Sequence, residues 1–137
     1  MRSRLRIGVL AATAAGALAL TAAPASAATT PWQSPPPLAG LVCGATQAHA
    51  GSPGISFKPC IGSDAGGARA MLLVTNGSGG PVTASAQVRT AWGSNADCPA
   101  TSLRSGQVRS CHGDAVPAAQ PQLPSGTLTV NGITDHF

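Results

Sequence analysis

The side chains best suited to catalysis in this chain are three histidines, His49, His112 and His136. A histidine can act as the general base for a serine nucleophile when an aspartate orients its imidazole. The Gly-x-Ser-x-Gly elbow, which presents the nucleophile in one large class of serine hydrolases, does not occur in the sequence. A triad of distant residues would need one of these imidazoles to meet a serine and a carboxylate in a pocket. Because most surface histidines carry no such role, we expect no catalytic residues and no enzymatic activity.

Four aspartates supply all the acidic side chains, since the chain contains no glutamate. Glycoside hydrolysis uses two carboxylates on either side of a cleft. The aspartates instead stand in contexts typical of turns, such as Ser63-Asp64, Asn95-Ala96-Asp97 and Gly113-Asp114. Aspartate and asparagine side chains in such positions accept hydrogen bonds from nearby backbone amides. We therefore predict that these carboxylates cap turns.

Two short segments gather residues that could bind a metal, Cys111-His112-Gly113-Asp114 and Asp135-His136. Structural zinc sites in small domains usually use Cys-x-x-Cys and His-x-x-x-His spacings, and neither occurs in this sequence. Cys111 is better explained as half of a disulfide. The sequence therefore predicts neither a metal nor another cofactor.

The N-terminus has the three parts of an export signal. Arg2, Arg4 and Arg6 form a basic start, residues 7–20 are almost wholly apolar, and Ala25-Ser26-Ala27 matches the pattern that signal peptidase accepts. The apolar run is shorter than the roughly 20 residues that a membrane span requires. We predict that residues 1–27 are a signal peptide. Residues 28–137 would then be secreted to the extracellular space as one domain, without stable membrane insertion.

The cysteines predict two disulfides, because an even number of cysteines in a short exported chain is typical of a cross-linked domain. Four cysteines allow three pairings. We favour Cys43–Cys60 and Cys98–Cys111, because each pair brackets a short segment with the pattern of a hairpin or loop. Each bridge would contribute about 3 kcal/mol by restraining the unfolded chain. The domain needs this contribution, because alanine rather than bulkier residues supplies much of its apolar content.

Loss of the signal peptide would reduce the formal net charge from +4 to about +1, because three of the eight basic residues leave with it. Nucleic-acid binders present a basic stripe to the phosphates. The remaining basic residues are spread along the chain and form no such stripe. We therefore expect no nucleic-acid partner.

Residues 28–40 contain three consecutive prolines and predict an extended, Pro-rich leader. Its Trp32 is the candidate contact residue of the chain, because exposed tryptophans stack on sugars or anchor protein partners. The same side chain could instead dock on the domain that follows. Trp92 shares the apolar side of a predicted strand and is expected to be buried.

The clearest strand signal runs from Val82 to Trp92, where apolar and polar residues alternate. A continuous apolar run at residues 70–74 precedes it and is consistent with a more fully buried strand. The segment between them, Asn76-Gly77-Ser78-Gly79-Gly80, contains Asn-Gly and Gly-Gly pairs, which accept positive φ at low cost. These features predict a β-hairpin formed by the two strands.

Weaker strand signals occur at residues 42–47, 55–61, 103–111 and 127–130. No segment after Ala27 has helical character, because Gly and Pro recur every few residues. Six or seven short strands with frequent turns predict an all-β fold for residues 41–137. We expect a small antiparallel β-sandwich of immunoglobulin-like architecture with two disulfides.

In general style the chain resembles the small secreted proteins of unknown function that are abundant in actinobacteria. The shared traits are the Arg-led signal ending in Ala25-Ser26-Ala27, the four cysteines, the Val74-Thr75-Asn76 turn and the segment from Ser105 to Cys111. The size and the two bridges also resemble the subtilisin-inhibitor-like proteins, which implies a protease-inhibiting loop. However, Cys98 is followed by Pro99-Ala100-Thr101, and the spacing of the cysteines differs from theirs.

These observations together predict a secreted protein, monomeric or weakly associating, with a binding or structural role and no catalytic activity. Its partner would be a protein or a polysaccharide of the cell envelope. The alternative is an inhibitor of an extracellular serine protease, which would present a disulfide-held loop around Cys98–Cys111 to the enzyme.

Overall fold

The structure is a computed structural model that describes residues 27–137. The predicted signal peptide, apart from Ala27, lies outside the described residues. Within residues 27–137 the chain forms strands and no helix, as the sequence predicts. The nine strands are β1 (Val42–Cys43), β2 (Gln47–His49), β3 (Ser52–Asp64), β4 (Gly67–Asn76), β5 (Val82–Arg89), β6 (Ala96–Leu103), β7 (Val108–His112), β8 (Ser125–Val130) and β9 (Ile133–His136).

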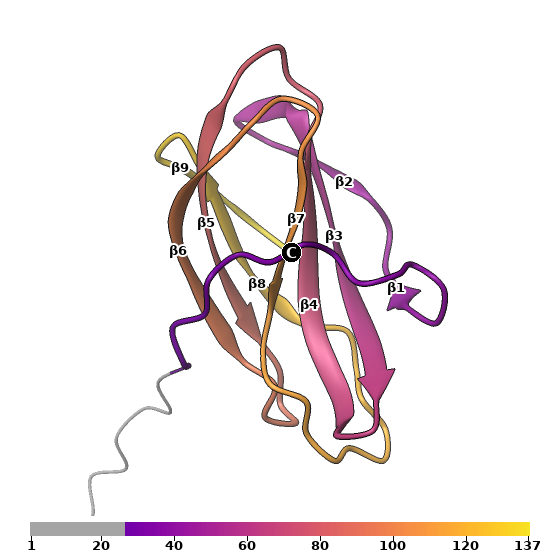
Figure 1. Ribbon diagram of the computed structural model, residues 1–137. Helices are drawn as coiled ribbons and strands as arrows, with labels where there is room; N and C mark the ends of the chain where they lie inside the picture. The colour runs from indigo at the N-terminus through magenta and orange to yellow at the C-terminus, as the bar shows by residue number, and fades with distance from the viewer. Residues whose placement is uncertain (1–26) are drawn as a thin grey trace, which may run out of the picture.

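The strands form two antiparallel sheets that face each other (Figure 1). One sheet has the order β1-β3-β4-β7, with β2 also paired to β3, and the other has the order β6-β5-β8-β9. The chain changes sheet between β4 and β5, between β6 and β7, and between β7 and β8. This order is that of an immunoglobulin-like sandwich. In that comparison β3, β4 and β7 correspond to strands A, B and E, and β5, β8 and β9 correspond to strands C, F and G. The predicted all-β sandwich is confirmed.

The core lies between the sheets and follows the alternation seen in the sequence. In β5, Val82, Ala84, Ala86 and Val88 are buried, while the residues between them face outward. They pack against side chains from the opposite sheet, namely Ile55, Phe57, Ala70, Leu72 and Val74. The strand ends at Arg89, because the next amide, that of Thr90, binds the side chain of Asn95 in a turn. Trp92 therefore lies beyond the strand, half-buried against the core.

The predicted hairpin between residues 70–74 and the Val82–Trp92 segment is wrong. β4 and β5 lie in opposite sheets, so residues 77–81 form an arch between layers. Asn76 is fully buried, and its side-chain nitrogen Nδ2 donates hydrogen bonds to the carbonyls of Gly80 at 3.0 Å and Leu103 at 2.9 Å. These bonds turn the chain out of the first sheet. A short Asn-Gly hairpin does occur, at Asn131-Gly132 between β8 and β9, with φ of 47° and 82°.

Both predicted disulfides are confirmed. Cys98–Cys111 lies inside the sandwich and joins β6 to β7, the edge strands of opposite sheets. Cys43–Cys60 joins directly paired residues of β1 and β3. Its Cys60 belongs to a second apolar cluster with Met71 and Leu73. This cluster explains why residues 70–74 are continuously apolar, since both faces of β4 are covered.

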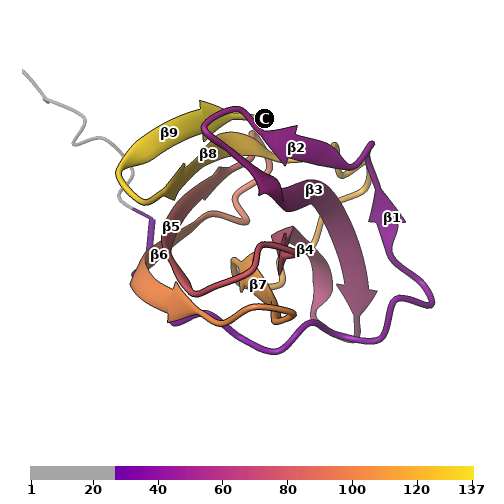
Figure 2. The same cartoon turned by 90° about the horizontal axis from the view of Figure 1, so that it is seen from above.

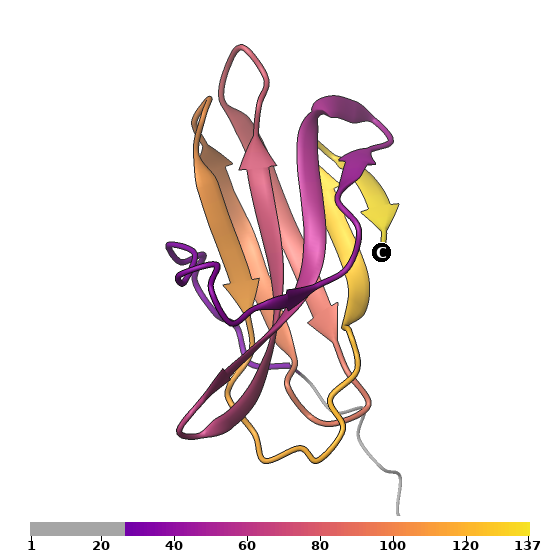
Figure 3. The same cartoon turned by 90° about the vertical axis from the view of Figure 1, so that its right-hand side faces the viewer.

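Separate chain segments close the two open sides of the sandwich. On one side, residues 28–33 pass from the edge of β6 to the edge of β7, through bridges from Thr29 to Asp97 and from Gln33 to Ser110 (Figure 2). On the other side, β2 lies beside β9 (Figure 3), and the Ala50 amide donates to Asp135 at 2.8 Å. The sandwich is therefore closed on both sides by backbone and side-chain hydrogen bonds.

Candidate functional site

Residues 34–41, which we call the strap, cross the outer face of the sheet over β7, β4 and β3 (Figures 1 and 2). Before the strap, two backbone hydrogen bonds of 3.0 and 2.8 Å join Gln33 to Ser110. After it, the Cys43–Cys60 disulfide and a 2.9 Å bond from the Gly44 amide to the Pro59 carbonyl fix the chain to β3. The three prolines at positions 35–37 have no amide hydrogens, so they lie over the sheet without pairing to it.

A pocket of about 240 Å³ lies between the strap and the outer face of the sheet. Its strap side is apolar, and its sheet side combines apolar and charged groups. The strap contributes Pro36, Pro37, Ala39, Gly40 and Leu41. The sheet contributes Gly62, Ser63, Asp64, Arg69, Met71 and His112.

The strand register explains why these side chains meet. His112 of β7 pairs with Met71 of β4, so their side chains stand next to each other on the outer face. Arg69 lies two residues before Met71 on the same face and pairs with Gly62 of β3. A Cβ added to Gly62 would come within 2.9 Å of the Met71 methyl and 3.2 Å of a Leu41 methyl. The absence of a side chain at position 62 therefore lets Met71 and Leu41 pack close to the backbone of β3 under the strap.

Two nitrogen atoms of this pocket are buried without a hydrogen-bond partner among the described residues, His112 Nε2 and Arg69 Nε. His112 is only 6% exposed, and its other nitrogen, Nδ1, lies 3.2 Å from the Ser110 hydroxyl. The Arg69 guanidinium reaches Asp64 through Nη2 at 3.3 Å, in a pair that is partly open to solvent. Burial, and secondly the positive charge of Arg69, lower the pKa of His112 from its ordinary value of 6.5. The imidazole is therefore neutral at pH 7.

The three histidines considered for catalysis lie in different parts of the fold. His49 is buried and uses both ring nitrogens in hydrogen bonds to backbone groups. His136 is exposed on β9. His112 does contact a serine, but Ser110 is fully buried, and the structure records no hydrogen bond from His112 to a carboxylate. His112 and Arg69 thus line the pocket and each keeps one nitrogen without a partner, whereas the serine is closed to substrate.

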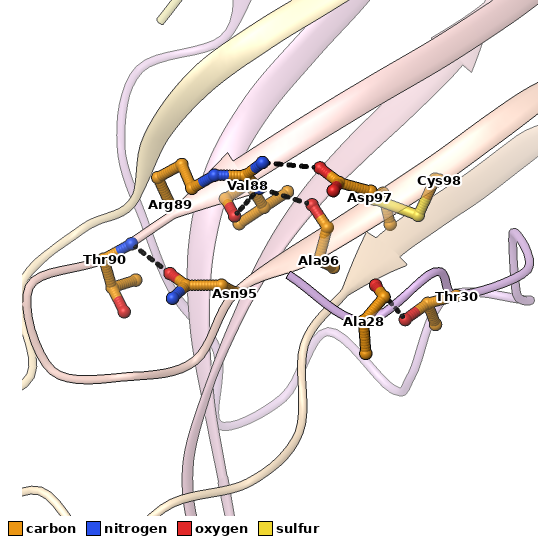
Figure 4. Close-up of polar contacts among 10 residues, drawn as sticks. Ala28, Thr30, Val88, Arg89, Thr90, Asn95, Ala96, Asp97 and Cys98 are labelled. Carbon is orange, nitrogen blue, oxygen red and sulfur yellow. Dashed lines mark hydrogen bonds and ion pairs between the residues drawn. A yellow bond between two sulfur atoms is a disulfide. The ribbon is translucent and has the colours of Figure 1, made fainter. Parts of the chain in front are cut away.

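The aspartates divide between capping and ion pairing. Asp64 accepts the Gly66 amide at 2.8 Å, which confirms the predicted turn cap. Asp97 does not cap a turn: it lies in β6 and pairs with Arg89 at 2.7 Å, while Arg89 also donates to two backbone carbonyls (Figure 4). Asp135 accepts the amides of Ala50 and His136, and these bonds lower its pKa.

The remaining sequence candidates fall outside the pocket. Trp32 is half-buried against the core, and its Nε1 donates to the Pro99 carbonyl at 2.9 Å. It docks on the domain at the edge of β6, and a contact of this side chain with a partner stays a prediction. In residues 27–137 no three His, Cys or Asp side chains come together in a way that could hold a metal ion.

Sequence reasoning did not identify Arg69 as a site residue. A signal for it does exist: Arg69 shares its parity in β4 with Met71 and Leu73, and apolar residues on an outer face indicate that something covers that face. The sequence pattern does not indicate which segment provides the cover.

Within residues 27–137 no helix is long and apolar enough to cross a membrane. Comparison with protein-family models, curated proteins and solved structures gives no match to this chain.

Proposed function

We propose that this chain is an exported, non-catalytic binding module of the extracellular space or cell envelope, and that it holds a small ligand in the pocket under the strap. The observation that carries this proposal is that two residues lining one pocket, His112 and Arg69, each have a buried nitrogen without a partner, Nε2 and Nε. Buried polar atoms nearly always have a hydrogen-bond partner in folded proteins.

The energetic cost of these two nitrogens supports a ligand. A buried donor or acceptor left without a partner costs about 1–3 kcal/mol, and more when it is charged. A ligand that supplies the missing partners recovers this cost on binding. The apolar strap residues around Leu41 would cover the rest of the ligand, as is usual in small-molecule sites.

The form of the strap also supports binding. Its two ends are fixed by the Gln33–Ser110 pairing and by Cys43–Cys60, so the pocket is formed before a ligand arrives. A preformed site avoids the entropic cost of ordering a loop on binding. The two disulfides are typical of proteins that fold in an oxidising compartment, which fits export.

A ligand screen by NMR tests the binding proposal. Residues 28–137, purified with both disulfides formed, would be titrated with a library of small molecules while backbone amide shifts are recorded. We expect the shifts of at least one compound class to concentrate at Met71, His112 and Leu41. Gly62→Val, whose side chain projects under the strap, should abolish them. Gly79→Val is the matched control, because a Cβ at Gly79 meets no atom within 4 Å.

Two outcomes would contradict the proposal. One is a library in which no compound shifts the pocket amides, and the other is binding that Gly62→Val leaves unchanged. Export is tested separately, by expressing residues 1–137 in a secreting host and sequencing the N-terminus of the product. Recovery in the medium with Ala28 first is the expected result, and retention inside the cell would contradict it.

The alternative function, inhibition of a serine protease, stays a prediction. The turn between β6 and β7 carries an exposed arginine, Arg104, whose chain segment is tethered by Cys98–Cys111. Stoichiometric inhibition of a trypsin-like protease that Arg104→Ala removes would favour this alternative. Cleavage of the turn by the protease would count against it.

A further inference from the structure

We infer that the ligand of the strap pocket is a small monocarboxylate with a compact apolar body, whose carboxylate bridges Arg69 Nε and His112 Nε2. This inference rests on the proposed function and names the chemistry of that same site. The starting point is the donor set. Arg69 Nε carries a hydrogen at every accessible pH, so its missing partner has to be an acceptor.

The hydrogen bonds of Ser110 show how His112 can serve the same acceptor. The Ser110 hydroxyl lies 3.2 Å from His112 Nδ1 and 3.5 Å from the Gln33 carbonyl. The hydroxyl can accept a hydrogen bond from Nδ1–H and donate its own hydrogen to the Gln33 carbonyl. In a protonated His112, Nε2–H would then be the one ring N–H without a partner. An anion at Nε2 completes this chain of hydrogen bonds. Its negative charge also offsets the desolvation and the Arg69 charge that hold His112 neutral in the free protein.

The charge balance of the wall favours an anion with one charge over an anion with two. The charged and titratable groups of this pocket are Arg69 on β4, His112 on β7 and Asp64 at the end of β3. The strap contributes none, because residues 34–41 contain no charged side chain. Asp64 already neutralises part of the Arg69 charge at 3.3 Å. When a monocarboxylate binds and His112 takes up one proton from the solvent, the wall stays near neutrality, whereas a dianion such as phosphate would be repelled by Asp64.

The size and lining of the pocket define the remainder of the ligand. About 240 Å³ lies at or below the small end of ordinary ligand sites. Leu41, Met71 and the strap prolines give apolar walls next to the two nitrogens. A compact ring or branched alkyl group bearing one carboxylate fits both requirements.

The experiment compares benzoate with two neutral molecules of nearly the same shape, benzamide and benzyl alcohol. Each would be titrated into the disulfide-bonded protein at pH 7 while the His112 and His136 imidazole signals are followed by NMR. Benzoate is expected to shift the His112 signals, to leave those of the exposed His136 unchanged, and to bind at least about tenfold more tightly than benzamide. Calorimetry in two buffers of different ionisation enthalpy should show proton uptake with benzoate and none with benzamide.

Substitutions test the two bridging groups. His112→Gln and Arg69→Gln should each remove the preference for benzoate over benzamide, while His136→Gln and Arg104→Gln should keep it. The spectrum and melting temperature of each variant would show that it is folded. Binding of benzamide as tight as that of benzoate would overturn the carboxylate inference and leave the pocket proposal standing. Binding of none of the three probes would overturn the inference, whereas the wider library screen decides the proposed function.

Discussion

His49 and Leu128 join the two sheets through a buried hydrogen bond, in which His49 Nε2 donates to the Leu128 carbonyl at 3.0 Å. A carbonyl can only accept, so the hydrogen of this imidazole lies on Nε2. The other nitrogen, Nδ1, accepts the Gly51 amide at 3.2 Å. The imidazole also packs edge-on against Phe57, with ring centroids 6.3 Å apart. One side chain thus connects β2, β8 and the core.

Replacing His49 by alanine should lower the free energy of unfolding by about 2–4 kcal/mol. The substitution leaves the Leu128 carbonyl without its partner and opens a cavity beside Phe57. Urea unfolding at pH 7 measures the loss. His136→Ala is the control, because His136 is exposed and its replacement should change stability by no more than about 0.5 kcal/mol. Equal losses for the two variants would contradict the bridging role.

Removing either disulfide should destabilise the domain by about 3 kcal/mol, since the bridged residues are 13 and 17 positions apart. The two bridges differ in a second measurement, amide exchange at Leu41, whose amide donates to the Leu38 carbonyl inside the strap. Replacing Cys43 and Cys60 by serine should speed this exchange under folding conditions. Replacing Cys98 and Cys111 should leave it slow. A fully reduced protein that melts at the same temperature as the oxidised one would contradict the loss of stability, and equal Leu41 exchange in the two variants would contradict the difference between the bridges.

The free energy of unfolding should decrease as the pH drops below about 6.5, because His112 resists protonation in the folded protein. Burial and Arg69 lower its pKa in the folded protein, whereas the unfolded chain binds the proton at the ordinary value of 6.5. Acid therefore favours the unfolded state: the contribution is complete above pH 6.5 and is lost as the pH falls toward the lowered pKa. His112→Asn should flatten the profile between pH 5 and 7, measured by urea unfolding. His136→Asn should retain the slope, and a slope that survives His112→Asn would rule out His112 as its source.

Replacing Asn76 by alanine should lower the free energy of unfolding by about 2–4 kcal/mol, because its side-chain amide donates two hydrogen bonds in a fully buried position. Its oxygen also accepts from the Ser78 amide at 2.9 Å. Ser78→Ala keeps the bonds to Gly80 and Leu103 and should cost much less. Thermal unfolding of both variants provides the comparison, and similar melting temperatures would contradict the role of Asn76 in the arch. Asn76-Gly77-Ser78 also matches the N-glycosylation sequon. Because both side-chain amide hydrogens of Asn76 are used inside the fold, this site is closed to modification in the folded domain.

The sequence predicted the features that depend on local pattern. Alternation in Val82–Val88 identifies a strand with one buried face, and the short segments between cysteines identify both disulfides. The hairpin failed because Asn-Gly-Ser-Gly-Gly permits both a tight turn and an arch. The choice is made by the buried contact of Asn76 with Leu103, which lies far away in the sequence.

The pocket could not be predicted for a related reason. Its wall combines β3, β4, β7 and the strap, and their proximity depends on the strand order. The proline run indicates an extended segment, but its path over β4 depends on anchors at Ser110 and Cys60. The sequence gives the chemical types of Arg69 and His112, whereas only the register of the sheet brings them to one site.

The passage of residues 28–33 along the edges of β6 and β7 has a consequence for the behaviour of the protein at high concentration. Unpaired edge strands readily recruit strands of other molecules and begin aggregation. Here the backbone bonds of Thr30 and Gln33 occupy both edges on that side. Proteolysis that removes residues 28–33 would expose the unpaired backbone edges of both β6 and β7. The fraction of molecules that keep residues 28–33, more than the stability of the core, should therefore determine how long a concentrated preparation stays free of aggregates.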